Sequence, residues 1–111
     1  MIRPVTEAGG LEAAAAADVA VLYKHSPRCG ASRTAQAEVR RFADAHPEVL
    51  VFELDVVAHR PMAREAAERF GVRHASPQVI VLRRGRVVWD GSQWEVEAGA
   101  IEAQVRADAP A

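Results

Sequence analysis

The sequence predicts an α/β fold, in which a single domain spanning 1–111 carries a four-stranded mixed sheet flanked by helices. The chain has 111 residues, half of them hydrophobic, which suits one compact core and is too short for two. Apolar segments of strand length alternate with helical periodicities in the first two thirds, as in parallel β–α–β units. Two strand-like segments then follow each other closely around a glycine turn, which predicts an antiparallel pair.

The first half of the chain predicts two helices and two strands. The run 19–23 is continuously apolar, as expected for a strand that is buried on both faces. In the segment that follows, Ala35, Val39 and Phe42 recur at helical spacing. The expected elements are, in order, a frayed start at 1–10, an alanine-rich helix at 11–17, a strand at 19–23, a loop at 24–28, a helix at 30–45 and a strand at 49–55.

The second half predicts two more helices and a hairpin. Pro61 suits the first turn of a helix, and Gly71 suits its C-terminal cap. Gly85 lies in a turn between two apolar runs, which is typical of a hairpin. The expected elements are, in order, a helix at 59–70, strands at 78–82 and 86–89, a helix at 95–107 and a frayed tail at 108–111.

Charge and cysteine content narrow the function classes. The net charge of -1 and the pI near 6.4 give no reason to expect a nucleic acid or an anionic membrane as partner. The single cysteine excludes an internal disulfide and favours a reducing compartment. No apolar run approaches the ~20 residues of a membrane helix, and acidic residues interrupt any signal-peptide core. We therefore expect a soluble, cytoplasmic protein, without a metal site because the histidines lack ligand spacing.

Cys29 lies where the first central strand is expected to end and a helix to begin. Ligands bind at the carboxyl ends of strands in an α/β sheet, and backbone N–H groups at a helix N-terminus favour a thiolate. Arg28 and Arg33 add positive charge, as does His25 when protonated. These features predict a lowered pKa and a reactive thiol. The alternative role, a small buried hydrophobe, fits poorly with the polar neighbours of Cys29.

The sequence does not decide the role of Ser32 or the conformation of the bond between Ser76 and Pro77. Ser32 follows Cys29 by one helical turn, so its hydroxyl either hydrogen-bonds the sulfur or satisfies the backbone of that turn. Ser76 and Pro77 directly precede the third strand, a place where proline is tolerated. A cis bond here makes a tight, fixed turn, and a trans bond makes an ordinary one. The spacing alone does not decide between them.

Separated motifs resemble known families. The segment 29–32, Cys-Gly-Ala-Ser, resembles the Cys-x-x-Cys or Cys-x-x-Ser motif of thioredoxins and glutaredoxins. Three segments are similar, in the same order, to the YtxJ family, which is described as monothiol, bacilliredoxin-like proteins of the bacillithiol system. They are KHSPRCGASR at 24–33, RFGVRHASPQ at 69–78 and VWDGSQW at 88–94. The resemblance extends over 19–96.

This resemblance implies a thioredoxin-like fold and a monothiol thiol–disulfide oxidoreductase. Cys29 would be the attacking thiol, Ser32 would replace a resolving cysteine, and Pro77 would be a cis-proline lining the site. The backbone of Ser76 would pair with a bound disulfide. The substrates would be S-thiolated client proteins, with the low-molecular-weight thiol, bacillithiol, as co-substrate and no tightly bound cofactor. Candidate contacts to the anionic part of that thiol are Lys24, His25, Arg28 and Trp94.

The chain departs from the thioredoxin pattern in two places. Tyr23 stands six residues before the cysteine, where thioredoxins carry a buried aspartate. The loop before Pro77 is one residue longer than in thioredoxins. Together with the single cysteine, these departures argue against a general dithiol reductase.

Other resemblances leave two alternative functions. Monothiol glutaredoxins with a Cys-Gly-x-Ser motif carry iron–sulfur clusters, and Cys29 would then ligate a cluster in a dimer with an external thiol. The segment 23–33 is also similar to the active-site loop of glutaredoxin-dependent arsenate reductases. Those enzymes use an arginine just before the proline of the third strand, where this chain has Ser76.

Overall fold

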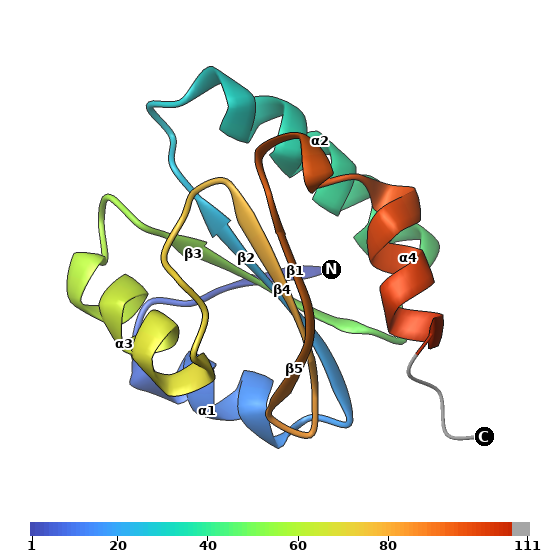
Figure 1. Ribbon diagram of the computed structural model, residues 1–111, viewed down its shortest axis with the longest axis horizontal. Coiled ribbons are helices and arrows are strands. Elements are labelled where there is room, and N and C mark those ends of the chain that lie inside the picture. The colour runs from blue at the N-terminus through green and yellow to red at the C-terminus, as the bar shows by residue number, and fades with distance from the viewer. Residues whose placement is uncertain (108–111) are drawn as a thin grey trace.

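The computed structural model describes residues 1–107 and is built on a five-stranded sheet between two helical layers (Figure 1). Helices α1 and α3 cover one face of the sheet, and α2 and α4 cover the other. No helix within residues 1–107 has the length and apolarity needed to cross a bilayer. The elements are, in order, β1 (Ile2–Pro4), α1 (Ala8–Ala16), β2 (Val19–His25), α2 (Gly30–Ala45), β3 (Leu50–Asp55), α3 (Arg60–Phe70), β4 (Gln78–Arg83), β5 (Arg86–Ser92), η1 (Gln93–Glu95) and α4 (Ala98–Ala107).

The strands follow the order β1-β3-β2-β4-β5 across the sheet. The first three run parallel, whereas β4 runs antiparallel to both β2 and β5. The predicted α/β fold with a mixed sheet is therefore confirmed, with parallel pairs first and a hairpin last. The predicted count of four strands is wrong, because β1 adds a fifth. Its three residues are too few to show a periodicity, and it is defined only by its pairing with β3.

Residues 1–10 do not fray as expected. Val5 is 2 % exposed, and its N–H donates to the carbonyl of Glu53 at 2.8 Å. Gly10 lies in the first turns of α1, where a Cβ would come within 2.7 Å of Val5 Cγ1. The glycine that resembles a helix breaker in the sequence thus allows close packing of the N-terminal segment. The expected frayed tail at 108–111 lies outside the described residues.

The sheet separates two hydrophobic clusters, and β2 contributes to both. Leu22 packs on the α1 and α3 side, and Tyr23 packs on the α2 and α4 side. Because successive side chains of a strand point to opposite faces, Lys24 follows the direction of Leu22 and His25 follows that of Tyr23. This alternation decides which helical layer each residue near the site faces.

The carboxyl end of β2 lies further along the chain than predicted. Lys24 pairs with Gln78, and His25 pairs with Asp55, so both belong to the strand rather than to the expected loop at 24–28. The hydrophobic run stops at Tyr23, but the backbone ladder continues, since pairing with neighbours rather than side-chain polarity sets this strand end.

The last predicted helix, 95–107, is divided in two. β5 continues to Ser92, and a capping box between Ser92 and Glu95 then starts the short helix η1. Helix α4 begins only at Ala98. The interruption creates a turn at 93–97 that packs against α2 near the site.

Candidate active site

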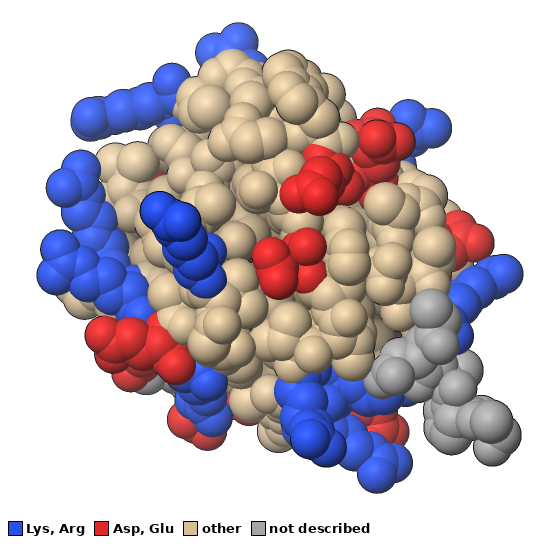
Figure 2. Space-filling model, viewed as in Figure 1, with Lys and Arg blue, Asp and Glu red and all other residues tan. Residues whose placement is uncertain are grey.

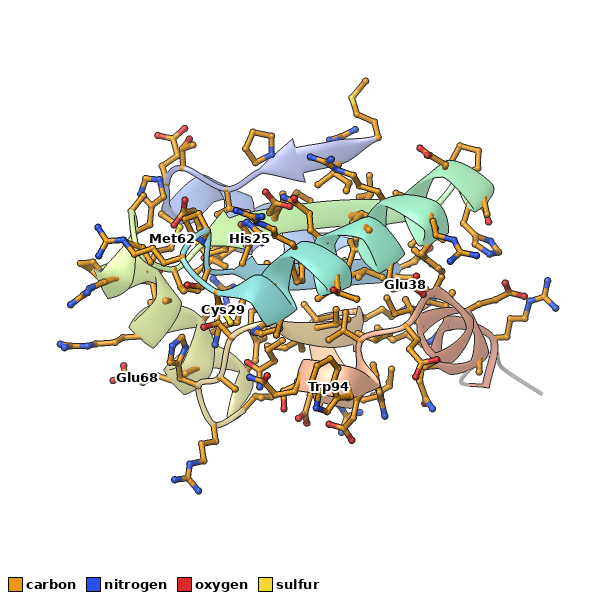
Figure 3. The ribbon with its side chains drawn as sticks, turned by 90° about the horizontal axis from the view of Figure 1, so that it is seen from above. His25, Cys29, Glu38, Met62, Glu68 and Trp94 are labelled. Atoms are coloured by element: carbon orange, nitrogen blue, oxygen red, sulfur yellow. The ribbon has the colours of Figure 1, made fainter. Side chains whose placement is uncertain are left out.

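Cys29 is the N-cap of helix α2, directly after the loop that leaves β2. Its backbone is extended, with φ -108° and ψ 127°, and its side chain is partly exposed. The N–H of Cys29 donates to the carbonyl of Ser26 at 3.1 Å, which closes the loop before the helix. In Figure 3, Cys29 lies at the start of α2, with His25 on one side of it and Trp94 on the other. The predicted position of the thiol at a helix start is confirmed.

The surroundings of Cys29 lower the pKa of its thiol. The largest causes are hydrogen bonds from the backbone N–H groups of Ser32 and then Ala31. Desolvation opposes them, and the Ser32 hydroxyl makes the smallest contribution, which also lowers the pKa. The two amides belong to the first turn of α2, where backbone N–H groups point toward the N-cap residue and stabilise a thiolate there. Arg28 and Arg33 are exposed, and the causes of the lowered pKa are hydrogen bonds rather than their charge.

Ser32 combines both of the roles that the sequence left open. Its side chain is fully buried and contributes to the stabilisation of the Cys29 thiolate. Its hydroxyl oxygen also accepts a hydrogen bond from the N–H of Ser26 at 3.3 Å. Ser32 therefore links the sulfur to the loop that precedes it. A serine here fixes the loop while leaving the thiol unpaired.

Tyr23 replaces the charged group of thioredoxins with a buried phenol. Its hydroxyl donates to the carbonyl of Ser32 at 2.9 Å and lies 2.9 Å from Nδ1 of His25. Because the single hydroxyl proton points to Ser32, Nδ1 of His25 donates to the tyrosine oxygen. Burial raises the pKa of Tyr23 far above its ordinary value, so it stays neutral. His25 thus orients the loop through Tyr23.

The bond between Ser76 and Pro77 is cis, as the resemblance implied. The backbone of Ser76 is not wholly free, because its carbonyl accepts a hydrogen bond from Gln93 Nε2 at 3.1 Å. The N–H of Gln93 donates to the carbonyl of Pro77, also at 3.1 Å. Gln93 adopts a left-handed backbone with φ 55°. The cis-proline loop is therefore fastened to η1 by one residue.

Lys24 lies inside the protein, although the sequence placed it in a loop. Its side chain is 0 % exposed, and Nζ donates to Oε1 of Gln78 at 3.0 Å. Nε2 of Gln78 in turn donates to the carbonyl of Arg73. Burial lowers the pKa of Lys24 to about 8. Burial, and next the charge of Lys24, lower the pKa of His74.

A cleft of about 360 Å³ opens between α3 and the loop before Pro77. Ser26 and Ser76 line it on the side of the thiol loop. The residues lining it are Ser26, Val56, Val57, Arg60, Ala63, Arg64, His74 and Ser76. Figure 2 shows basic side chains along the edge of the molecule where α3 lies. The cations of this cleft carry no local signal in the sequence, because only the fold brings α3 beside the loop.

Trp94 and Arg28 are the exposed members of the predicted site. Trp94 is 76 % exposed and lines a groove together with Ala31, two residues after Cys29. Arg28 is exposed in the loop next to Cys29. The structure therefore places Ser32 against the thiol and Arg28 and Trp94 at its rim. Lys24 lies apart from these, on the α3 side of the sheet.

Solved structures share this fold over almost the whole chain. One described as having a thioredoxin fold is 19 % identical, with a TM-score of 0.87, and the match covers 95 % of this chain and 94 % of that one. Thioredoxin from Trypanosoma brucei brucei is 15 % identical, with a TM-score of 0.79 and coverage of 96 % and 89 %. A mutant thioredoxin from Halobacterium salinarum NRC-1 is 17 % identical, with a TM-score of 0.80 and coverage of 99 % and 92 %.

These likenesses define the fold as that of thioredoxin, and a single thiol at a helix N-terminus is the chemical feature of the site. With the family match that follows, these likenesses place the chain in the class of the thioredoxin-fold thiol oxidoreductases. The sequence profile of the family described as monothiol bacilliredoxin BrxC matches residues 3–101. The chain belongs to this family, which confirms the resemblance drawn from the three motifs.

Proposed function

We propose that the protein removes a low-molecular-weight thiol, bacillithiol, from S-thiolated client proteins through Cys29. The observation that carries the proposal is that Cys29 is the single cysteine of the chain and that backbone amides of α2 lower its pKa. A thiolate at neutral pH is the attacking species in disulfide exchange. With no second cysteine to form an internal disulfide, the thiol that completes the cycle comes from another molecule. Family membership supports bacillithiol as that molecule.

The proposed cycle has two exchange steps. The Cys29 thiolate attacks the bacillithiol sulfur of a client mixed disulfide, so a bond to Cys29 forms and the client thiolate leaves and takes up a proton. A second bacillithiol, as its thiolate, then attacks the bacillithiol sulfur on Cys29. Cys29 is released as a thiolate, and the product is the symmetrical bacillithiol disulfide. Both electrons that reduce the client come from bacillithiol, so no bound cofactor is needed.

Each site residue has a separate role in this proposal. Ser32 positions the loop and supports the thiolate, and His25 acts at a distance by orienting Tyr23. The exposed Arg28 and Trp94 contact the substrate at the rim of the site. The backbone of Ser76 contacts the mixed disulfide beside Pro77. A free thiol of this kind needs a reducing environment, which favours the cytoplasm.

The test is a client protein that carries a labelled bacillithiol mixed disulfide. We expect Cys29→Ala to abolish release of the label, because no other thiol exists in the chain. Ser32→Ala should lower turnover by no more than about fivefold, since a neutral hydrogen bond contributes about 1 kcal/mol. Ser32→Cys should form an internal disulfide with Cys29, because the two thiols would lie one helical turn apart.

The same preparation tests the two alternative functions. Arsenate reduction that depends on Cys29, without release of label, would favour the arsenate reductase reading. Visible absorbance of freshly purified protein, lost in Cys29→Ala and without release of label, would favour a carrier of iron–sulfur clusters. Either result would contradict the proposed exchange reaction.

A further inference from the structure

A groove on the α2 and α4 side of the sheet has no part in the exchange chemistry described so far. It has a volume of about 370 Å³ and lies between α2 and the segment 93–97, which contains η1. Two residues form its end nearest the thiol. The N–H of Ala31 supports the thiolate, and Gln93 holds the carbonyls of Ser76 and Pro77. The groove therefore begins beside Cys29 and leads away from it.

One wall of the groove is a face of α2. Ala31, Thr34 and Glu38 follow one another along this wall at intervals of three and four residues, which places them on the same face of the helix. At 1.5 Å per residue, the wall from the first to the last of them is ~10 Å long. An extended chain advances ~3.3 Å per residue, so about three residues of a bound segment fit along it. The groove thus has the length of a short peptide segment.

The other wall presents an exposed tryptophan on a fixed backbone. Most of the Trp94 side chain is accessible, but its neighbours along the chain are held in place. Glu95 accepts a hydrogen bond from the N–H of Ser92 at 3.0 Å, and Val96 is buried in the core. Tryptophan is enriched among the residues that dominate protein interfaces, and a fixed conformation lowers the entropy lost on binding. Trp94 is therefore suited to contact a polypeptide.

Carboxylates give this groove a negative charge. Glu38 and Glu97 line it, and within residues 1–107 no lysine or arginine does. The N–H of Ala98 donates to Oε1 of Glu38 at 3.0 Å, and this bond is the largest cause that lowers the pKa of Glu38. Arg41 pairs with Oε2 of Glu38, whereas Glu97 is exposed at the rim. Figure 2 shows acidic side chains gathered where β5 leads toward α4, apart from the basic side chains along the α3 edge. The groove therefore complements a positively charged segment.

We propose that this groove binds the client polypeptide beside its S-thiolated cysteine and favours clients with an arginine about three residues from that cysteine. The proposal rests on the proposed function and names the class of its protein substrates. The guanidinium group stacks on the indole of Trp94 and pairs with the carboxylate of Glu97, two contacts that arginine makes at once. An acidic side chain in the same place would meet Glu97 and Glu38 and would be rejected.

Turnover tests the selection with two isomeric client peptides. Both carry the same mixed disulfide on a central cysteine and contain the same residues. In one isomer an arginine lies three residues to either side of the cysteine, and in the other the two arginines lie at the peptide ends. We expect kcat/KM to be at least fivefold higher for the first isomer, mainly through KM. Because the isomers have the same net charge, long-range attraction does not produce this difference.

Variants assign the preference to the groove. Glu97→Gln and Trp94→Ala should each reduce the preference to less than twofold. Glu68→Gln is the matched control, because it removes an exposed carboxylate on α3, on the other side of Cys29, and it should keep the preference (Figure 3). An equal loss of preference in Glu68→Gln would overturn the proposal, since it would indicate net charge rather than the groove. Equal losses of kcat/KM on both isomers in the groove variants would overturn it as well.

Binding tests the groove without any turnover. Because the chain has two tryptophans, its ¹⁵N NMR spectrum contains two indole signals, and Trp94→Phe assigns one of them to Trp94. Peptides with serine in place of cysteine, added to the Cys29→Ser variant, should shift the Trp94 signal saturably. The isomer with arginines near the centre should bind at least fivefold more tightly, and salt should weaken it. Glu97→Gln in the same background should remove this difference, and Glu68→Gln should not.

The two measurements separate the possible failures. Binding of the first isomer without turnover of either mixed disulfide would refute the proposed function and leave the groove standing. Turnover with equal kcat/KM for both isomers, or no peptide-dependent shift of the Trp94 signal, would overturn the groove proposal and leave the function standing. A Trp94 signal that moves with protein concentration in the absence of peptide would place a second copy of the chain in the groove and would also overturn the proposal.

Discussion

Cys29 shows how a single residue becomes reactive through its backbone rather than through neighbouring charges. The hydrogen bonds that lower its pKa come chiefly from the amides of Ser32 and Ala31, with a smaller contribution from the Ser32 hydroxyl. We therefore expect the pH midpoint of iodoacetamide alkylation to lie below that of free cysteine. Ser32→Ala should raise the midpoint and slow alkylation at pH 7 by a factor of about five. Arg33→Gln, a change of charge only, should leave it unchanged. If Arg33→Gln shifted the midpoint as far as Ser32→Ala, charge would be the cause instead.

The fold destabilises the charged form of Lys24, whereas it stabilises the charged form of Cys29. Burial lowers its pKa from 10.5 to about 8, so the folded state disfavours the ammonium form by about 3 kcal/mol. Below pH 8, Lys24 is protonated in both the folded and the unfolded state, so the folded state bears the full cost of burying the ammonium group. Between pH 8 and 10.5 only the unfolded state holds the proton, so stability rises with pH, and above this range the cost is gone.

Replacing Lys24 should therefore stabilise the fold at neutral pH. Lys24→Met should raise the free energy of unfolding by roughly 1–2 kcal/mol at pH 7, since the lost hydrogen bond to Gln78 offsets part of the gain. At pH 10.5 the gain should vanish or change sign. Urea unfolding of both proteins at the two pH values measures this. A destabilised variant at pH 7 would show that the buried ammonium has a compensating partner.

The element that most shapes the site is the short helix η1, which the sequence did not predict. Gln93 begins it with φ 55°, a conformation that costs a non-glycine residue about 1 kcal/mol, and holds the carbonyls of Ser76 and Pro77. Both Gln93→Gly and Gln93→Ala remove the side-chain hydrogen bond to Ser76. Only Gln93→Gly also removes the strain of the left-handed backbone, because glycine adopts a positive φ without cost. We expect Gln93→Ala to be less stable than Gln93→Gly by about 1 kcal/mol in urea unfolding. Equal stabilities would mean that the turn carries no strain.

Elements with a strong local pattern were predictable, and those defined by pairing were not. Helix α2 could be recognised because Ala35, Val39 and Phe42 repeat at helical spacing and pack on one face of the sheet. The three residues of β1 and the polar end of β2 carry no such pattern, since their ladders depend on partners far along the chain. Boundaries set by tertiary contacts therefore lie beyond a local analysis of the sequence.

At the scale of the whole molecule, the site also combines features that the local sequence predicts with features that only the folded chain creates. The position of Cys29 and the cis bond before Pro77 followed from local motifs and their resemblance to a family. The burial of Lys24 and the cleft formed by Arg60 and His74 required the folded chain, because residues from β2, α3 and the loop before β4 meet only there. A single lysine among thirteen arginines was a signal that could have drawn attention to this position.

Substitutions in the N-terminal segment test whether the edge strand β1 and the residues after it unfold together with the rest of the molecule. Val5→Ala should lower the free energy of unfolding by about 2 kcal/mol, because Val5 is buried in the cluster on the α1 and α3 side. Gly10→Ala should gain little or destabilise, since its Cβ would come within 2.7 Å of Val5. Combined with Val5→Ala, which removes the obstructing methyl groups, it should become stabilising by about 1 kcal/mol, as alanine is in a helix.

Gly9→Ala is the matched control, because a Cβ there would meet nothing within 4 Å. It should stabilise by about 1 kcal/mol with either residue at position 5. The double-mutant cycle between Val5 and Gly10 should therefore give an interaction free energy of about 1 kcal/mol or more, and the cycle between Val5 and Gly9 should give a value near zero. If Val5→Ala had no effect on urea unfolding, the first ten residues would fray independently of the core. The observed bond from Val5 N–H to the carbonyl of Glu53 argues for the cooperative outcome, since this bond ties the N-terminal segment to β3 within the central sheet.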